Sequence, residues 1–70
     1  MMRLTDSQAR VFNFIKDYIN TSGFPPTRSE IADGLGFASA NAAQEHLLSL
    51  QKKGVISLIP KVSRGLRING

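Results

Sequence analysis

The chain has 70 residues, no cysteine, one histidine and a formal net charge of +4. That length allows a single small domain, whose core is near the lower limit for independent folding and leaves no room for an ordinary catalytic cleft. Disulfides and thiolate metal sites are excluded because cysteine is absent, and His46 alone cannot form a histidine cluster. We therefore expect one domain over residues 1–70, no catalytic residues, no metal and no cofactor.

The basic charge is concentrated in the last part of the chain. Residues up to Glu45 carry a net charge of −1, whereas the residues after Glu45 carry +5 and include no acid. Together with a pI of about 10.2, this distribution favours a polyanionic partner that contacts the C-terminal part. The sequence contains no apolar run typical of a signal peptide and no segment of membrane-spanning length, so we expect a cytoplasmic protein without membrane contact.

A first helix is predicted from about residue 6 to residue 21. The stretch Thr5-Asp6-Ser7-Gln8 matches a capping box, in which the threonine hydroxyl and the glutamine side chain each accept a hydrogen bond from a backbone amide. Apolar residues then recur at helical spacing, and Gly23 is a suitable C-cap. We expect the following residues to pack in the core: Val11, Phe12, Phe14, Ile15, Tyr18 and Ile19.

A rigid corner and a short second helix follow. Pro25 and Pro26 cannot continue the first helix, because proline lacks the amide hydrogen and restricts the residue before it. Thr27-Arg28-Ser29-Glu30 is a second capping box, and Gly36 ends the helix. Gly34 inside this helix costs about 1 kcal/mol relative to alanine. The pattern therefore predicts a helix that is held by packing rather than by its own propensity.

A third helix is predicted between Ser39, a good N-cap, and Gly54, a good stop signal. One face is apolar and is expected to lie in the core: Ala43, Leu47 and Leu50. The opposite face is mostly polar: Asn41, Gln44, Glu45, Leu48 and Lys52. Amides can bond adenine, a carboxylate can accept from the cytosine amino group, and alanine can contact a thymine methyl. This face is a candidate for contacting DNA bases, and the alternative is an ordinary solvated helix face.

The short helix, the turn and the longer helix form a helix-turn-helix pattern over roughly residues 28–48. Only about three residues separate the second helix from the N-cap of the third, a spacing typical of two helices that cross steeply. The first helix would complete their core. The same pattern also describes three-helix bundles that do not bind DNA, so both interpretations stay open on this pattern alone.

Beyond Gly54 the apolar period changes from helical to alternating, which predicts a β-hairpin over roughly residues 55–68. Its loop carries Lys61, Ser63 and Arg64, and Asn69 begins an expected tail. A basic hairpin beside such a helix is placed to meet the phosphate backbone, as the wing of a winged helix-turn-helix does. The alternative is an exposed edge hairpin whose basic side chains serve only to prevent pairing with the strands of other molecules.

The sequence resembles the N-terminal DNA-binding domains of the LexA family of bacterial SOS-response repressors. The resemblance spans nearly the whole chain without a gap, and its most specific motifs are PPTR-x-EIA at residues 25–32 and LGF-x-S-x-NAA-x-EHL at residues 35–47. It also includes Lys53-Gly54-Val55-Ile56 and Ser63-Arg64-Gly65. The chain departs from the family at Gln44, which is often glutamate, at Leu48, which is often basic, and around Ala38 and Ala40. These departures lie in the surface expected to contact bases, so they weaken the expectation that the operator is the familiar CTGT-type palindrome.

The resemblance implies a mainly α fold of three helices with a two-stranded wing. It also implies repression of DNA-damage-response genes by a nucleoid-associated protein that binds palindromic operators as a dimer and blocks polymerase. Base contacts are implied for one set of residues: Ser39, Asn41, Ala42, Gln44 and Glu45. Contacts to the DNA backbone are expected for a second set: Thr27, Arg28, Leu48, Lys52, Lys53, Lys61, Ser63 and Arg64.

Family members continue into a C-terminal domain that carries a self-cleaving Ser/Lys pair, responds to RecA and supplies dimerisation. The 70 residues contain none of it, so the sequence is compatible with an excised DNA-binding domain or with a natural short relative, and a RecA contact is expected only through that absent domain. We expect a monomer when free and two copies on DNA. The runner-up function is a winged-helix module that binds protein, which should show a connected apolar patch in place of the polar face with flanking cations.

Overall fold

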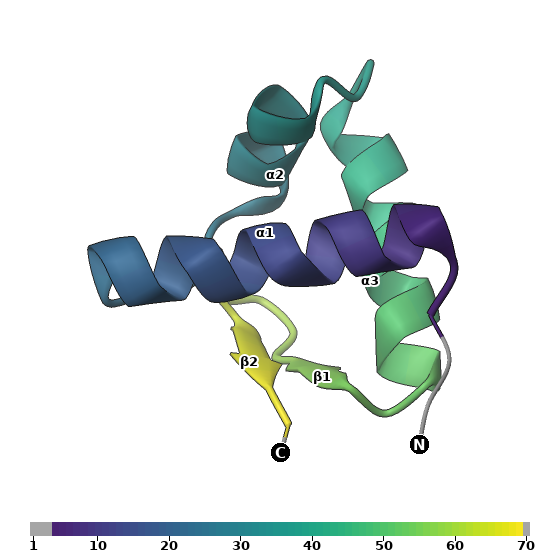
Figure 1. Cartoon of the computed structure of the whole chain (residues 1–70). Coiled ribbons are helices and arrows are strands. Elements are labelled where there is room, and N and C mark those ends of the chain that lie inside the picture. The colour runs from purple at the N-terminus through teal and green to yellow at the C-terminus, as the bar shows by residue number, and fades with distance from the viewer. Residues whose placement is uncertain (1–3, 70) are drawn as a thin grey trace.

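The computed structural model describes residues 4–69 and contains three helices and a two-stranded sheet. The elements are α1 (Asp6–Ser22), α2 (Arg28–Leu35), α3 (Ala40–Lys52), β1 (Ile56–Leu58) and β2 (Leu66–Ile68). In Figure 1, α1 crosses in front of α3, α2 lies above α1, and the two strands lie below it. The predicted winged helix-turn-helix architecture is therefore confirmed.

Both predicted capping boxes are present. The Thr5 hydroxyl accepts from the Gln8 amide at 3.1 Å while Oε1 of Gln8 accepts from the Thr5 amide at 3.0 Å. At α2 the same pair of bonds joins Thr27 and Glu30, at 3.1 and 2.8 Å. These bonds satisfy amides that the first turn of a helix leaves without backbone partners, so each helix begins where its capping box predicts.

The core lies where the three helices and the base of the hairpin meet. Its buried apolar residues are Val11, Ile15, Ile31, Ala32, Ala43, Leu47, Leu50, Ile56 and Leu66. The predicted buried face of α3 is confirmed by Ala43, Leu47 and Leu50. Phe12 and Phe14 are only partly buried and pack against the edge of this core. Because α1 covers the buried face of α3, the polar face of α3 points away from α1.

Gly34 of α2 faces the Phe14 ring of α1. A β-carbon added to Gly34 would overlap the Cε2 and Cζ atoms of Phe14. The sequence predicted a helix weakened by this glycine and held by packing, and the structure shows the packing contact that requires a residue without a side chain.

The strands pair antiparallel, with Ile56 opposite Ile68 and Leu58 opposite Leu66. The hairpin lies within the predicted residues 55–68. β1 ends at Leu58, and the Ile59 amide then donates to the Gly65 carbonyl at 2.7 Å. Pro60, which has no amide hydrogen, then begins the turn.

Asn69 was expected to begin a tail but is part of the hairpin. Its backbone amide donates to the Val55 carbonyl at 3.0 Å. Its side chain donates to the Gly54 carbonyl and accepts from the Ser57 hydroxyl. Asn69 thus closes the open end of the wing, and Gly70 lies outside the described residues.

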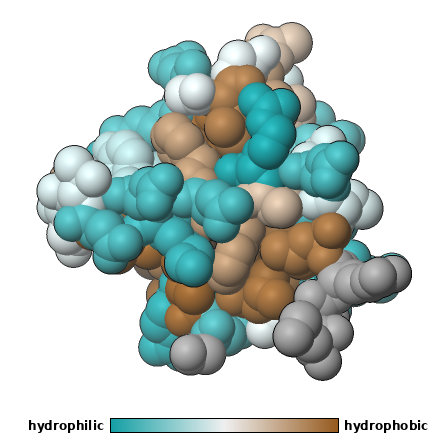
Figure 2. Space-filling view, in the orientation of Figure 1, coloured by the Kyte–Doolittle hydropathy of each residue, from teal (hydrophilic) through white to brown (hydrophobic). Residues whose placement is uncertain are grey.

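Figure 2 shows the α1 side of the molecule, on which hydrophilic residues follow α1 and hydrophobic ones gather below it. α1 therefore presents a polar outer face while its other face packs on α3. Within residues 4–69, no helix combines the length and the apolar character that crossing a bilayer requires.

Candidate nucleic-acid interface

The residues predicted to contact bases lie together at the start of α3. Asn41 and Glu45 are exposed one turn apart, while Ala42 and Gln44 are partly exposed beside them. Ser39 is the N-cap, and its Oγ accepts from the Ala42 amide at 3.3 Å. This bond uses the serine oxygen as an acceptor and leaves its hydroxyl hydrogen to donate elsewhere.

A groove of about 610 Å³ runs between the start of α2, the start of α3 and the wing. Five residues that the sequence predicted as DNA contacts line it: Thr27, Arg28, Gln44, Lys61 and Ser63. They are separated by up to 36 positions along the chain, and the fold brings them onto opposite walls of one open groove. The groove is lined by amide, hydroxyl and cationic groups together with apolar wing residues, which suits a solvated, charged strand rather than a small apolar ligand.

The remaining predicted contacts follow α3 away from this groove. Leu48 is 51% exposed, and Lys52 is exposed in the last turn of α3. Lys53 is the C-cap and is half-buried, with its backbone amide donating to the Ser49 carbonyl at 3.1 Å. The exposed face of the helix thus carries polar and cationic side chains at both ends and the apolar Leu48 between them.

The wing tip exposes two apolar residues that the sequence analysis did not single out. Ile59 is 49% exposed and Val62 is 54% exposed. Between them Lys61 has a positive φ of 65°, a left-handed conformation that costs a non-glycine residue roughly 1 kcal/mol. The turn therefore holds the lysine in a conformation that the chain would not choose locally.

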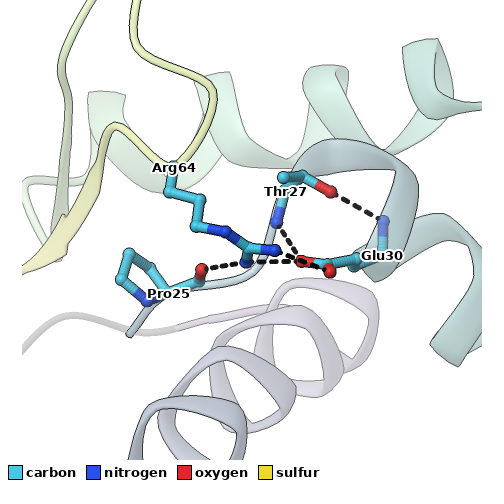
Figure 3. A network of polar contacts seen from close by, with 4 residues as sticks. All are labelled: Pro25, Thr27, Glu30 and Arg64. Atoms are coloured by element: carbon cyan, nitrogen blue, oxygen red, sulfur yellow. Dashed lines mark hydrogen bonds and ion pairs between the residues drawn. The ribbon is translucent and has the colours of Figure 1, made fainter. Parts of the chain in front are cut away.

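Arg64 was predicted to contact the DNA backbone, and in the structure its guanidinium is held within the molecule. Nη1 and Nη2 donate to the two carboxylate oxygens of Glu30 at 2.7 and 2.9 Å, and Nη1 also donates to the Pro25 carbonyl at 2.8 Å. The guanidinium carbon lies 4.6 Å from the ring centre of Phe24. Figure 3 shows Arg64 reaching from the loop before β2 to the start of α2.

Sequence reasoning recognised Glu30 as part of a capping box but not as the partner of Arg64. The two residues are 34 positions apart, so no local periodicity or spacing connects them. Only the opposite charges of the two side chains were visible in the sequence, and several other acids and bases shared that signal.

The ion pair also sets the protonation of both groups. The hydrogen bonds from Arg64, followed by the one from the Thr27 amide, lower the pKa of Glu30 from 4.5 to about 2. The same contact with Glu30 raises the pKa of Arg64 above its usual value. Both groups are therefore charged throughout the neutral range.

In the part of the chain that the structure describes, no three acidic or histidine side chains gather into a group able to hold a metal ion. His46 instead stacks on Phe37, with the ring centres 5.0 Å apart and the planes at 20°. This contact gives the histidine a packing role where α3 meets the turn before it.

Comparison with known proteins agrees with this geometry. The family model described as the LexA DNA binding domain matches residues 1–65. LexA repressor 1 of Pseudomonas syringae pv. tomato is 54% identical over 70 residues, covering 100% of this chain and 35% of that protein. The LexA repressors of Hahella chejuensis and Herminiimonas arsenicoxydans are 52% and 54% identical over 68 residues, covering 97% of this chain and 34% and 31% of theirs. The chain thus spans about a third of the length of these relatives, and it belongs to the LexA DNA binding domain family.

Proposed function

We propose that this chain binds double-stranded DNA sequence-specifically, as the DNA-binding domain of a LexA-type transcriptional repressor of DNA-damage-response genes. The observation that carries the proposal is the exposed face of α3, where amide and carboxylate side chains lie beside a groove bounded by the basic wing. A major groove about 12 Å wide admits an α-helix, so this face can reach base edges. The names of the relatives, which are LexA repressors, support the same function.

Within this function the start of α3 supplies the base contacts. Asn41 would bond an adenine, and the Glu45 carboxylate would accept from a cytosine amino group. Gln44 lines the groove from α3 and would contact the neighbouring base. Ala42 would pack on a thymine methyl, and Ser39 would donate its free hydroxyl hydrogen.

The sugar-phosphate backbone would lie in the groove and along the outer end of α3. Thr27 and Arg28 face it from α2, and Lys61 and Ser63 face it from the wing. These four residues would hold one strand between the two walls. Further along the helix, Lys52 and Lys53 would contact phosphates, and the exposed Leu48 would pack against a sugar.

Two copies would occupy the two halves of a palindromic operator, because one α3 reaches only one half-site. Each copy binds DNA as a monomer in this proposal, and the symmetry of the operator sets their spacing. A role as a protein-binding module is less well supported, because the exposed face of α3 carries charged and amide groups at Asn41, Glu45 and Lys52.

Selection of bound sites from random duplex DNA by the purified chain tests the proposal. We expect enrichment of one motif with two-fold symmetry. The matched control is an Asn41→Ala, Glu45→Ala variant, which should keep its salt-dependent affinity for random duplex and lose the enrichment. Equal recovery of all sequences by the parent chain would contradict sequence-specific binding.

A further inference from the structure

Arg64 connects the wing to the start of the helix-turn-helix. Its two terminal nitrogens engage both oxygens of Glu30, at 2.7 and 2.9 Å, in the bidentate arrangement that fixes orientation as well as distance. Nη1 also donates to the Pro25 carbonyl (Figure 3), and the guanidinium carbon lies 4.6 Å from the ring centre of Phe24. Four contacts thus direct one side chain of the wing loop to a single position on the neighbouring segment.

Glu30 is itself held in place. Its Oε1 accepts from the Thr27 amide at 2.8 Å, and its own amide donates to the Thr27 hydroxyl at 3.1 Å. The carboxylate that accepts these hydrogen bonds from Arg64 therefore belongs to the first turn of α2 and moves with that turn. Thr27 lines one wall of the groove, while Ser63, next to Arg64 in the chain, lines the other wall. The Arg64–Glu30 pair accordingly ties together the two walls of the groove.

The charge of Arg64 is already balanced by this carboxylate. The side chains of Arg64 and Glu30 are 38% and 35% exposed, and their bidentate hydrogen bonds pair the two opposite charges directly. A phosphate at Arg64 would have to compete with a bidentate carboxylate and would lie close to that negative charge.

We propose that Arg64 is a positioning residue. Its bidentate ion pair with Glu30 sets the distance of the wing from α2 and α3, and its guanidinium does not itself neutralise a phosphate. This inference rests on the proposed function and deepens it, because it states that one ion pair sets the width of the groove that receives the DNA backbone. Glu30, an acid beside a DNA-binding groove, then favours DNA binding through Arg64 although its own charge repels phosphate.

Three substitutions separate positioning from direct contact, each measured as affinity for one selected operator across a range of salt concentrations. Arg64→Lys keeps the charge and can still meet a phosphate as a point charge, but it cannot form the bidentate pair. Positioning therefore predicts severalfold weaker binding for this variant. Glu30→Gln should also weaken binding severalfold, whereas removal of a repulsive charge alone would strengthen it. Arg64→Gln and Arg64→Lys should have the same slope of log K against log salt, because both lose the bidentate pair and the charge at position 64 meets no phosphate.

Arg28→Gln is the matched control, because Arg28 lines the same groove and is proposed as a direct contact. It should lower the magnitude of the salt slope by about 0.9. The proposal is overturned if Arg64→Lys binds like the parent, if Glu30→Gln binds more tightly, or if the slope of Arg64→Gln is smaller than that of Arg64→Lys by as much as Arg28→Gln loses.

A distance measurement decides the question independently of DNA. Since the chain has no cysteine, Ser29→Cys and Val62→Cys place two spin labels at exposed positions on α2 and on the wing. The parent should give one narrow distance distribution, and the Arg64→Lys and Glu30→Gln variants a broader one. An unchanged distribution would overturn the positioning role, whereas absence of specific binding in the parent would overturn only the proposed function. Melting curves of each variant show whether the helices are folded at the temperature used.

Discussion

Gly34 of α2 and Phe14 of α1 meet so closely that no β-carbon fits between them. An added methyl at Gly34 would overlap the outer atoms of the Phe14 ring, and this ring also packs 6.0 Å from Tyr18. A β-carbon at Gly34 would therefore require the Phe14 ring to shift from the position in which it packs against Tyr18. The distance between α1 and α2 depends on the absence of one side chain.

Gly34→Ala should destabilise the protein although alanine is the better helix former. The helix propensity gain is about 1 kcal/mol, whereas overpacking a well-packed contact costs about 1–3 kcal/mol. Urea unfolding measures the balance. In a Phe14→Leu background the same substitution should be neutral or stabilising, because the smaller side chain leaves space for the methyl. Stabilisation by Gly34→Ala in the parent would show that the ring yields at little cost.

Acid should weaken the fold through Glu30. Folded Glu30 takes up a proton only near pH 2, whereas the unfolded residue does so near pH 4.5. The unfolded state therefore binds more protons in this interval, so the contribution of Glu30 is complete above about pH 4.5 and is lost as the pH falls toward 2. Urea unfolding of the parent and of Glu30→Gln between pH 2 and pH 7 should show that the difference in their stabilities shrinks below about pH 4.5. A difference that is constant with pH would contradict the lowered pKa.

Glu45→Ala should relax the base preference at one position of each half-site. If the carboxylate accepts from a cytosine amino group, its loss should cost about 1–3 kcal/mol of discrimination there and leave the other positions unchanged. Binding to a library of single-base operator variants measures this. If Glu45 is only a surface charge, the substitution should instead strengthen binding to every duplex without changing the base profile.

Lys61→Asn should separate stability from DNA binding. Asparagine tolerates the left-handed backbone better than lysine does, so the variant should be as stable as the parent or more stable. It should bind all duplexes more weakly and lower the magnitude of the salt slope by about 0.9, because one proposed phosphate contact is removed. Thermal melting and salt titration are the two measurements. An unchanged slope would place the wing tip outside the interface.

The free chain should be a monomer, and two copies should fill a two-fold operator. Of the residues that the structure describes, the exposed large apolar ones are Phe24, Leu48, Ile59 and Val62. Phe24 is covered on one face by Arg64, and Leu48 lies on the proposed DNA-contacting face of α3. Sedimentation equilibrium with and without operator DNA measures the stoichiometry, and a tight dimer in the absence of DNA would contradict this prediction.

The elements themselves were predictable because their signals are local. A capping box joins residues three positions apart, as Thr27 and Glu30 are, and an apolar face repeats within two turns, as Ala43, Leu47 and Leu50 do. Such patterns determine where a helix begins and which side of it is buried, whatever the rest of the chain does. Three candidate base contacts, Asn41, Gln44 and Glu45, follow from the same local pattern because they lie opposite the buried stripe, whereas Ser39 and Ala42 came from the family resemblance.

What only the tertiary structure decided are the pairings between distant segments. The sequence by itself determined three helices, a hairpin and the buried face of α3, and it predicted which exposed residues of α3 are candidates for base contacts. It did not determine that Arg64 forms an ion pair with Glu30, 34 positions away in the chain, or that the Phe14 ring packs against Gly34. These contacts depend on how the packed helices and the wing are oriented, which follows from the whole core and from no single stretch of sequence. A lone arginine in a basic loop is equally suited to a phosphate and to a carboxylate, and only the folded position of Glu30 selects between them.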